Sequence, residues 1–263
     1  MKTLRLFLLA LIAVIAFPIS VLAGDNWGLH FPEKGAQPRG NKSAEYLAQF
    51  GAFYVGNDTD KVIYLTFDAG YENGYTSTVL DVLKKHEAPA AFFLVGMYIR
   101  DEPELIRRMV DEGHIIANHT MRHPDMSNMN TKEAFYKELK EVEDIYQSVT
   151  GTTLPKFYRP PKGIYNDANL KLAQELGYTT VFWSLAYRDW ENDNQPSHAT
   201  AIEKMVPRIH PGAVILLHNT SKTNAEVLDE LLTQYKSLGY RFEDLFHLTN
   251  SDASASCNFG KVF

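Results

Sequence analysis

Apolar runs alternate with amphipathic stretches along most of the chain. In the runs nearly every position is apolar, and they lie at residues 62–67, 90–95, 114–117, 179–185 and 213–217. Short runs of this kind, rich in β-branched and aromatic residues, are typical of strands buried on both faces of a sheet. A shorter extended piece is expected at residues 156–158.

Between these runs, apolar residues recur every three or four positions, which is the spacing of an amphipathic helix. Helices are predicted at residues 76–86, 103–112, 131–150, 167–176, 199–209 and 224–238. Thr131 is placed to cap the third of them, and Gly113, Gly177 and Gly239 each follow a predicted helix end. The alternation indicates an α/β fold with a parallel sheet covered by helices. About seven repeats favour a barrel over a short open sheet, although the repeat count alone does not establish closure.

The two ends of the chain differ from this repeating middle. Residues 1–23 contain Lys2 and Arg5, an apolar stretch and a small-residue cleavage pattern ending at Ala23, which is typical of a secretory signal; an uncleaved membrane anchor is the alternative. Residues 24–59 are rich in Pro and Gly and are expected to wrap irregularly around one domain at residues 60–250. Residues 251–263 form a polar tail.

Charge and cysteine content narrow the possible functions. Loss of Lys2 and Arg5 with the signal takes the formal net charge from −6 to −8, and an acidic exported protein is a poor partner for nucleic acid. The chain has no phosphate-binding GxxxxGK[ST] loop, GxGxxG fingerprint or GxSxG elbow, so neither nucleotide binding nor serine esterase chemistry is expected. The single cysteine, Cys257, excludes an intramolecular disulfide, and a monomer is expected.

Polar side chains follow five of the extended segments. They are Asp68 after residues 62–67, His119 and His123 after 114–117, Arg159 after 156–158, Asp189 and Trp190 after 179–185, and His218 after 213–217. In a parallel α/β barrel these ends lie on one rim, where active sites are built. The sequence therefore predicts that these side chains meet in one site.

His119 and His123 have the i, i+4 spacing that places two imidazoles on one face of a helical turn, which suits a divalent cation such as zinc. Alone, such a pair is more often two ordinary surface histidines, but the neighbouring strand ends favour a metal site. Asp68 could instead cap a turn, and His218 could be a buried structural histidine. Asp68, Glu72 and Asp189 leave a glycosidase carboxylate pair open, since the sequence does not give their separation.

The segments TFDAG, HTMRHP, RPPKG, RDW and LLHN occur in this order and resemble the five motifs of the polysaccharide deacetylases of carbohydrate esterase family 4, the NodB-homology group. The likeness extends over about residues 62–246. TFDAGYENGYT and FWSLAYRDW are most similar to the subgroup that acts on spore-cortex peptidoglycan and leads to muramic δ-lactam. The resemblance implies a distorted (β/α)7-type barrel that hydrolyses an N-acetyl group on a glycan sugar.

Carried onto this sequence, the resemblance makes Asp68 the general base and His218 the general acid, with His119 and His123 as metal ligands. Arg159 would orient Asp68, and Asp189 would pair with His218. The residues expected to contact the substrate are Trp190, Tyr71, Pro160 and Asn219.

Ala69 departs from the family pattern, which reads TFDDG and uses the second Asp as a metal ligand. A methyl group cannot coordinate a cation, so two of the usual three protein ligands remain. The subgroup that the chain resembles also lacks this Asp. The expected partner is a peptidoglycan glycan strand in the cell wall or spore cortex; a chitin- or acetylxylan-type deacetylase and a non-catalytic glycan-binding module are the alternatives.

Overall fold

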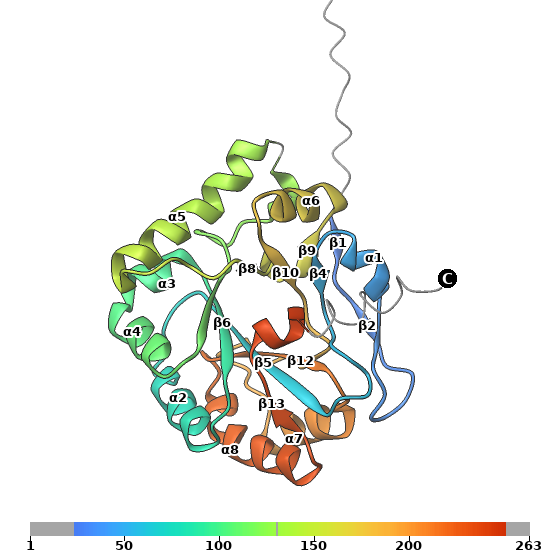
Figure 1. Cartoon of the computed structure of the whole chain (residues 1–263). Helices are drawn as coiled ribbons and strands as arrows, with labels where there is room; N and C mark the ends of the chain where they lie inside the picture. Colours follow the sequence, from blue (N-terminus) through green and yellow to red (C-terminus); the bar gives the residue numbers. More distant parts are fainter. Residues whose placement is uncertain (1–23, 130, 251–263) are drawn as a thin grey trace, which may run out of the picture.

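The computed structural model describes residues 24–129 and 131–250, and these form a curled sheet surrounded by helices (Figure 1). Nine strands of this part of the chain make the main sheet, in the order β11-β12-β5-β6-β7-β8-β10-β4, with β13 beside β5. All their pairings are parallel. The strands are β4 (Ala52–Phe53), β5 (Val62–Ala69), β6 (Ala90–Leu94), β7 (Ile115–Asn118), β8 (Phe157–Tyr158), β10 (Thr179–Val181), β11 (Leu185–Ala186), β12 (Ala213–His218) and β13 (Arg241–Phe242).

Helices cover the outer side of the curled sheet (Figure 1). They are α2 (Thr76–Lys85), α3 (Gly96–Asp101), α4 (Pro103–Asp111), α5 (Lys132–Thr150), α6 (Asp167–Glu175), α7 (His198–Met205) and α8 (Lys222–Ser237). Short 3-10 turns lie at η1 (Met126–Asn128), η2 (Pro161–Gly163) and η3 (Val206–Arg208). Thr131 caps α5 through its side chain, as predicted, and Gly113, Gly177 and Gly239 have the positive φ of residues that follow helix ends.

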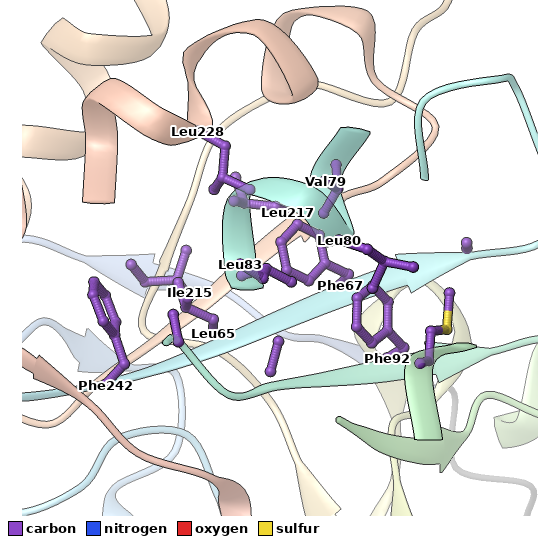
Figure 2. Packing of buried hydrophobic residues seen from close by; sticks show 14 of the residues in the cluster. Leu65, Phe67, Val79, Leu80, Leu83, Phe92, Ile215, Leu217, Leu228 and Phe242 are labelled. Carbon is purple, nitrogen blue, oxygen red and sulfur yellow. The ribbon is translucent and has the colours of Figure 1, made fainter. Parts of the chain in front are cut away.

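Strand β5 separates two apolar layers, because successive side chains of a strand point to opposite faces. Leu65 and Phe67 pack outward against helix residues such as Leu80 (Figure 2). Tyr64 belongs instead to the cluster that fills the barrel interior together with Phe93. Asp68 shares the parity of Tyr64, so it is the last interior-facing residue of the strand.

The interior beneath Asp68 is filled by side chains. Leu245 and Leu248, from a helical segment at residues 245–250, belong to the interior cluster. This segment lies across the middle of the barrel in Figure 1, and His247 Nδ1 is 3.0 Å from the hydroxyl of Tyr64. A ligand could therefore approach Asp68 only from the carboxyl ends of the strands.

The distorted barrel expected from the sequence is confirmed, and its closure is incomplete. Strands β4 and β11 are the two ends of the strand order. Near them an isolated antiparallel bridge joins Val55 to Ala213, and the Gly56 amide donates to the carbonyl of Gly212 over 2.8 Å. Gly212 has a φ of 70°, and a Cβ there would lie 2.5 Å from the Gly56 carbonyl carbon, so only glycine permits this approach.

The prediction of one strand at residues 179–185 is wrong, because the chain changes partners within it. β10 pairs with β8 and β4, whereas β11 pairs with β12. The Phe182 amide donates to the carbonyl of Phe53 at the β4 end of the sheet, whereas the Ser184 amide donates to the carbonyl of Val214 in β12. An apolar run shows that a segment is buried, but not which strand it pairs with.

The N-terminal segment is more regular than predicted. It contains β1 (Asp25–Asn26), β2 (Leu29–His30), β3 (Arg39–Gly40) and α1 (Ala44–Ala48), and β4 joins the main sheet. β1 pairs with β9 (Ile164–Tyr165), and beside it the Trp27 amide donates to the carbonyl of Gly163 over 2.8 Å. Trp27 Nε1 also donates to the carbonyl of Trp183 over 2.9 Å, and its ring stacks on Phe182 at 4.7 Å.

Helix α3 was not predicted, because at six residues it is too short to display a helical period. The helix predicted at residues 199–209 is shorter in the structure: α7 ends at Met205, and the 3-10 turn η3 follows it. The helix predicted from residue 224 begins two residues earlier, at Lys222, and Ser221 caps it. None of the helices in the described ranges is long and apolar enough to cross a membrane. The signal segment, the polar tail and Cys257 lie outside the described residues.

The helix-side layer supplies a test of core packing. We expect Leu80→Ala to lower the free energy of unfolding by about 2–5 kcal/mol, because Leu80 is fully buried and its truncation leaves a cavity. Leu238→Ala is the matched control at a 44% exposed leucine, and it should change stability by less than about 0.5 kcal/mol. Urea unfolding followed by circular dichroism measures both, and equal losses would contradict the assignment of this layer.

Candidate active site

A cavity of about 700 Å³ opens at the carboxyl ends of β5, β7 and β12. The polar and charged residues that line it are Asp68, Tyr71, His119, Arg122, His123, Lys162 and His218. Apolar or backbone contributions come from Ala69, Gly70, Val95, Met97, Gly163, Trp183, Trp190 and Leu216. The cavity therefore collects residues from the ends of several strands, as the sequence predicted.

Asp68 is held by the fully buried guanidinium of Arg159. The Nη1 atom donates to Asp68 Oδ1 over 2.6 Å, while Nε and Nη2 donate to the carbonyls of Val181 and Phe182 over 2.8 and 3.1 Å. The guanidinium also lies 4.1 Å from the ring centroid of Phe93. The Arg159 side chain thus contacts β5, β6 and β10. It also donates hydrogen bonds to two main-chain carbonyls at the point where the strand predicted at residues 179–185 is interrupted.

Asp68 remains ionised although it is buried. Burial alone would raise its pKa, but the charge of Arg159, the nearby His119 and His218, and the hydrogen bond from Arg159 together hold the pKa below its usual value. Asp68 Oδ2 is not engaged by Arg159 and lies 3.7 Å from His119 Nε2. This oxygen is therefore available to accept a proton.

His119 and His123 come together, but not on a helical turn as the spacing predicted. Thr120 and His123 have φ values of 68° and 59°, and the His123 amide donates to Thr120 Oγ1 over 3.0 Å. The loop folds back, and the two imidazole ring centroids are 4.8 Å apart. The two imidazoles are therefore brought together by the left-handed conformations of Thr120 and His123, and not by the helical turn that the spacing predicted.

The two histidines fit a divalent cation. His119 Nδ1 is 2.8 Å from the carbonyl oxygen of Arg159, which can only accept, so Nδ1 carries the proton and the lone pair of the neutral ring is on Nε2. Burial lowers the pKa of His119 and is the largest cause that lowers the pKa of His123 to about 4, so both rings are neutral near pH 7. Neutral imidazole is a good zinc ligand.

Ala69 adds no metal ligand to the two histidines, because a methyl group cannot coordinate a cation. It is buried and lines the cavity immediately after Asp68. Within the described residues no group of three His, Cys, Asp or Glu side chains is arranged to hold a metal ion. Two imidazoles, with Asp68 nearby, are therefore the available donors.

His218 faces the cavity from β12, directly beside Asp68, since the two residues are register partners in the ladder between β12 and β5. Its Nδ1 donates to Asp189 Oδ1 over 2.8 Å, and its amide donates to Asp189 Oδ2 over 2.9 Å. Asn224 Nδ2 also donates to Asp189 Oδ2 over 2.5 Å. Burial favours the neutral ring, but the charge and hydrogen bond of Asp189 outweigh it and raise the pKa of His218.

Comparisons with known proteins place this geometry in a family. The profile of the family described as polysaccharide deacetylase matches residues 55–181. The Bacillus subtilis protein named peptidoglycan-N-acetylmuramic acid deacetylase PdaA is 44% identical over 221 residues, which are 84% of this chain and 84% of that protein. This chain belongs to the polysaccharide deacetylase family.

Solved structures agree with the membership. The structure of Bacillus subtilis PdaA, described as a family 4 carbohydrate esterase, superposes with a TM-score of 0.83 at 43% identity and covers 87% of this chain and 98% of that one. A family 4 carbohydrate esterase from Bacillus anthracis superposes with a TM-score of 0.71 at 41% identity, covering 87% and 97%. The barrel is thus that of a family 4 carbohydrate esterase.

The structure divides the residues predicted to contact substrate in this deacetylase. Trp190 and Tyr71 line the cavity and are half exposed, and the Trp190 ring is 5.9 Å from that of His218. Pro160 and Asn219 are buried and do not line the cavity, and Asn219 Nδ2 donates instead to Thr76 Oγ1 over 2.7 Å. The structure therefore places neither the Pro160 nor the Asn219 side chain at the surface of the cavity.

Among the lining residues that sequence reasoning missed are four with long or aromatic side chains. Arg122 and Lys162 lie inside the HTMRHP and RPPKG motifs, so their positions carried a signal. Trp183 belongs to the run expected to be one strand, and Met97 belongs to the unpredicted helix α3. Their places depend on chain turns that hydrophobic periodicity does not reveal.

A glycosidase pair is not formed. Asp68 is the only carboxylate among the described residues that line the cavity. Glu72 accepts hydrogen bonds from the Gly74 amide at 2.6 Å and the Tyr98 hydroxyl at 2.7 Å, and Asp189 is buried behind His218. The cavity therefore offers one carboxylate, Asp68, and beside it His218, whose pKa is shifted in the opposite direction.

The Asp189 contact gives a pH prediction. An NMR titration should show a His218 pKa above the ordinary 6.5 in the wild type. In Asp189→Asn it should fall below 6.5, because burial continues to disfavour the charged ring. Asp193→Asn, at an exposed aspartate of the same loop, is the control and should leave the His218 titration unchanged.

The sign for stability follows from the same shift. Because the folded pKa exceeds the unfolded one, the stabilisation from protonated His218 is complete below pH 6.5 and disappears as the pH rises through the folded value. The difference in free energy of unfolding between the wild type and Asp189→Asn should therefore shrink as the pH rises from 6.5 through the folded pKa of His218. A difference that grew with pH would contradict the assignment.

Proposed function

We propose that this protein is an exported deacetylase that removes the acetyl group from N-acetylmuramic acid in peptidoglycan glycan strands of the cell wall or spore cortex. The observation that carries the chemistry is that Asp68 and His218 are register partners on adjacent strands of one cavity, with pKa values moved in opposite directions. Such a pair suits a base and an acid working on the same bond. The choice of sugar is supported by the likeness to a protein named as a muramic acid deacetylase.

Asp68 acts as the general base. Arg159 binds Oδ1 and leaves Oδ2 free, so the carboxylate is fixed in orientation and kept ionised until it accepts a proton. A water molecule that loses its proton to Oδ2 attacks the acetyl carbonyl carbon. A divalent cation held by His119 and His123 would, when bound, polarise that carbonyl and acidify the water.

His218 acts as the general acid. With Nδ1 bonded to Asp189, the proton on Nε2 is available to the amide nitrogen of the substrate. Protonation makes the nitrogen a good leaving group, and without it the tetrahedral intermediate would return to the amide. The C–N bond breaks, acetate and a free amino sugar result, and the proton accepted by Asp68 returns to solvent. On muramic acid the freed amine lies near the lactyl carboxylate, so lactam closure would be intramolecular.

Acetate release tests these roles. On peptide-free peptidoglycan, Asp68→Asn and His218→Ala should each lower kcat by about 10²–10⁴-fold, the usual contribution of general acid–base catalysis. Asp58→Asn and His198→Ala, at exposed positions away from the cavity, are the matched controls and should keep wild-type rates. Full activity in both active-site variants would refute the assignment.

The metal site is tested by binding and by activity separately. Ala69→Asp should tighten zinc binding by about 10-fold or more, because even outer-sphere partners of a metal are worth 10- to 100-fold. Ala69→Asn has the same shape without the charge and should tighten it much less. Calorimetry on the purified variants measures the affinity without any turnover, and unchanged affinity in Ala69→Asp would mean that the turn points the side chain elsewhere. A wild-type enzyme unaffected by chelators would contradict the metal role alone.

A further inference from the structure

Lys162 has an unusual backbone conformation at the edge of the cavity. It lies in η2 with a φ of 58° and a ψ of 8°, in the left-handed region, which costs a non-glycine residue about 1–2 kcal/mol. Its side chain is exposed and lines the cavity. Conformations of this kind persist where surrounding structure enforces them, and they are frequent at ligand-binding positions.

The turn that carries Lys162 is held firmly on both sides. The Gly163 amide donates to the carbonyl of Pro160 over 3.0 Å, and the Gly163 carbonyl accepts from Trp27 over 2.8 Å. A Cβ at Gly163 would lie 2.7 Å from the ring of Trp183 and 3.1 Å from Trp27 Cβ. This packing fixes the place from which the Lys162 side chain extends.

The charge of Lys162 is not balanced by the protein. Arg122, the other lysine or arginine that lines the cavity, is paired with Glu138 and Glu141 at 2.8 and 2.6 Å. The Lys162 side chain has no hydrogen bond or ion pair with any described residue. The single carboxylate of the cavity, Asp68, is already bound by Arg159. The cavity therefore contains one ammonium group that an anionic substrate group could pair with.

We propose that Lys162 binds the free carboxylate of the lactyl group and thereby selects muramic acid that has lost its peptide. The lactyl ether is on the carbon next to the one that carries the acetamido group, so its carboxylate must lie beside the reacting bond. Lys162 meets this requirement, because it lines the same cavity as Asp68 and His218. The inference rests on the proposed function, which leaves the selection of a peptide-free sugar unexplained.

An ion pair with Lys162 would distinguish peptide-free muramic acid from two other sugars of the glycan strand. An attached peptide converts the lactyl carboxylate into a neutral amide, which cannot form the ion pair. N-acetylglucosamine has a hydroxyl at the same carbon and offers no anion. Hydrogen bonds to charged groups lie in the range that changes binding by about 10- to 100-fold, so this contact is large enough to discriminate.

The test compares two variants and two ligands. Lys162→Asn removes the charge with a side chain that tolerates the left-handed conformation, and Lys162→Arg keeps the charge. Lys34→Asn, at an exposed lysine outside the cavity, is the matched control. The ligands are a glycan fragment ending in N-acetylmuramic acid and the same fragment with its lactyl carboxylate converted to a methylamide.

We expect Lys162→Asn to lower kcat/KM for the acid by about 10- to 100-fold, mainly through KM, and to leave the methylamide nearly unaffected. Lys162→Arg should keep the preference for the acid, and added salt should weaken it in the wild type. Equal losses on both ligands would show a merely structural role, and no loss on the acid would exclude the ion pair; either result overturns the proposal.

Binding separates this proposal from the proposed function. NMR titration with the same two ligands measures affinity without turnover. If the wild type released no acetate but bound the acid more tightly than the methylamide, and Lys162→Asn abolished that difference, the catalytic assignment would fail and the carboxylate site would stand. Equal wild-type affinity for both ligands would overturn the carboxylate site whatever the activity.

Discussion

The buried ion pair between Arg159 and Asp68 is the contact on which the other parts of the site depend. A fully buried guanidinium is tolerated only when its charge and its donors are satisfied, and here a carboxylate and two main-chain carbonyls do so. Loss of either partner would leave an uncompensated charge in the core, which typically costs 3–5 kcal/mol. The pair therefore serves stability and chemistry at once.

Arg159 also acts through its backbone. Its carbonyl fixes the tautomer of His119, while its side chain fixes the orientation of Asp68, so one residue positions both the proposed base and a proposed metal ligand. His218 is positioned separately, by Asp189. The proposed acid and the proposed base are thus positioned by different residues, although they are neighbours in the same pair of strands.

The sequence predicted the site better than the loops around it. Strand ends such as Asp68 and His218 could be found because parallel strands bring their carboxyl ends to one rim, which is a property of the fold. The direction of Asn219 could not, because it depends on a hydrogen bond to Thr76 in a helix far along the chain. The interruption of the strand after Val181 likewise depends on the hydrogen bond that Arg159 donates to the Val181 carbonyl. The loop that brings His123 back towards His119 depends on a left-handed φ at His123.

The bracing of Gly163 by Trp27 bears on where the catalytic unit begins. The family profile starts at residue 55, and the repeating strand–helix pattern starts near residue 60. Yet the turn that carries Lys162 is bounded by a residue well upstream of both. A fragment that began at residue 55 would keep Asp68, His119 and His218, and it would still lose the contact of Trp27 that holds the turn of Lys162 in place. The segment at residues 24–59 is therefore part of the folded unit that forms the cavity.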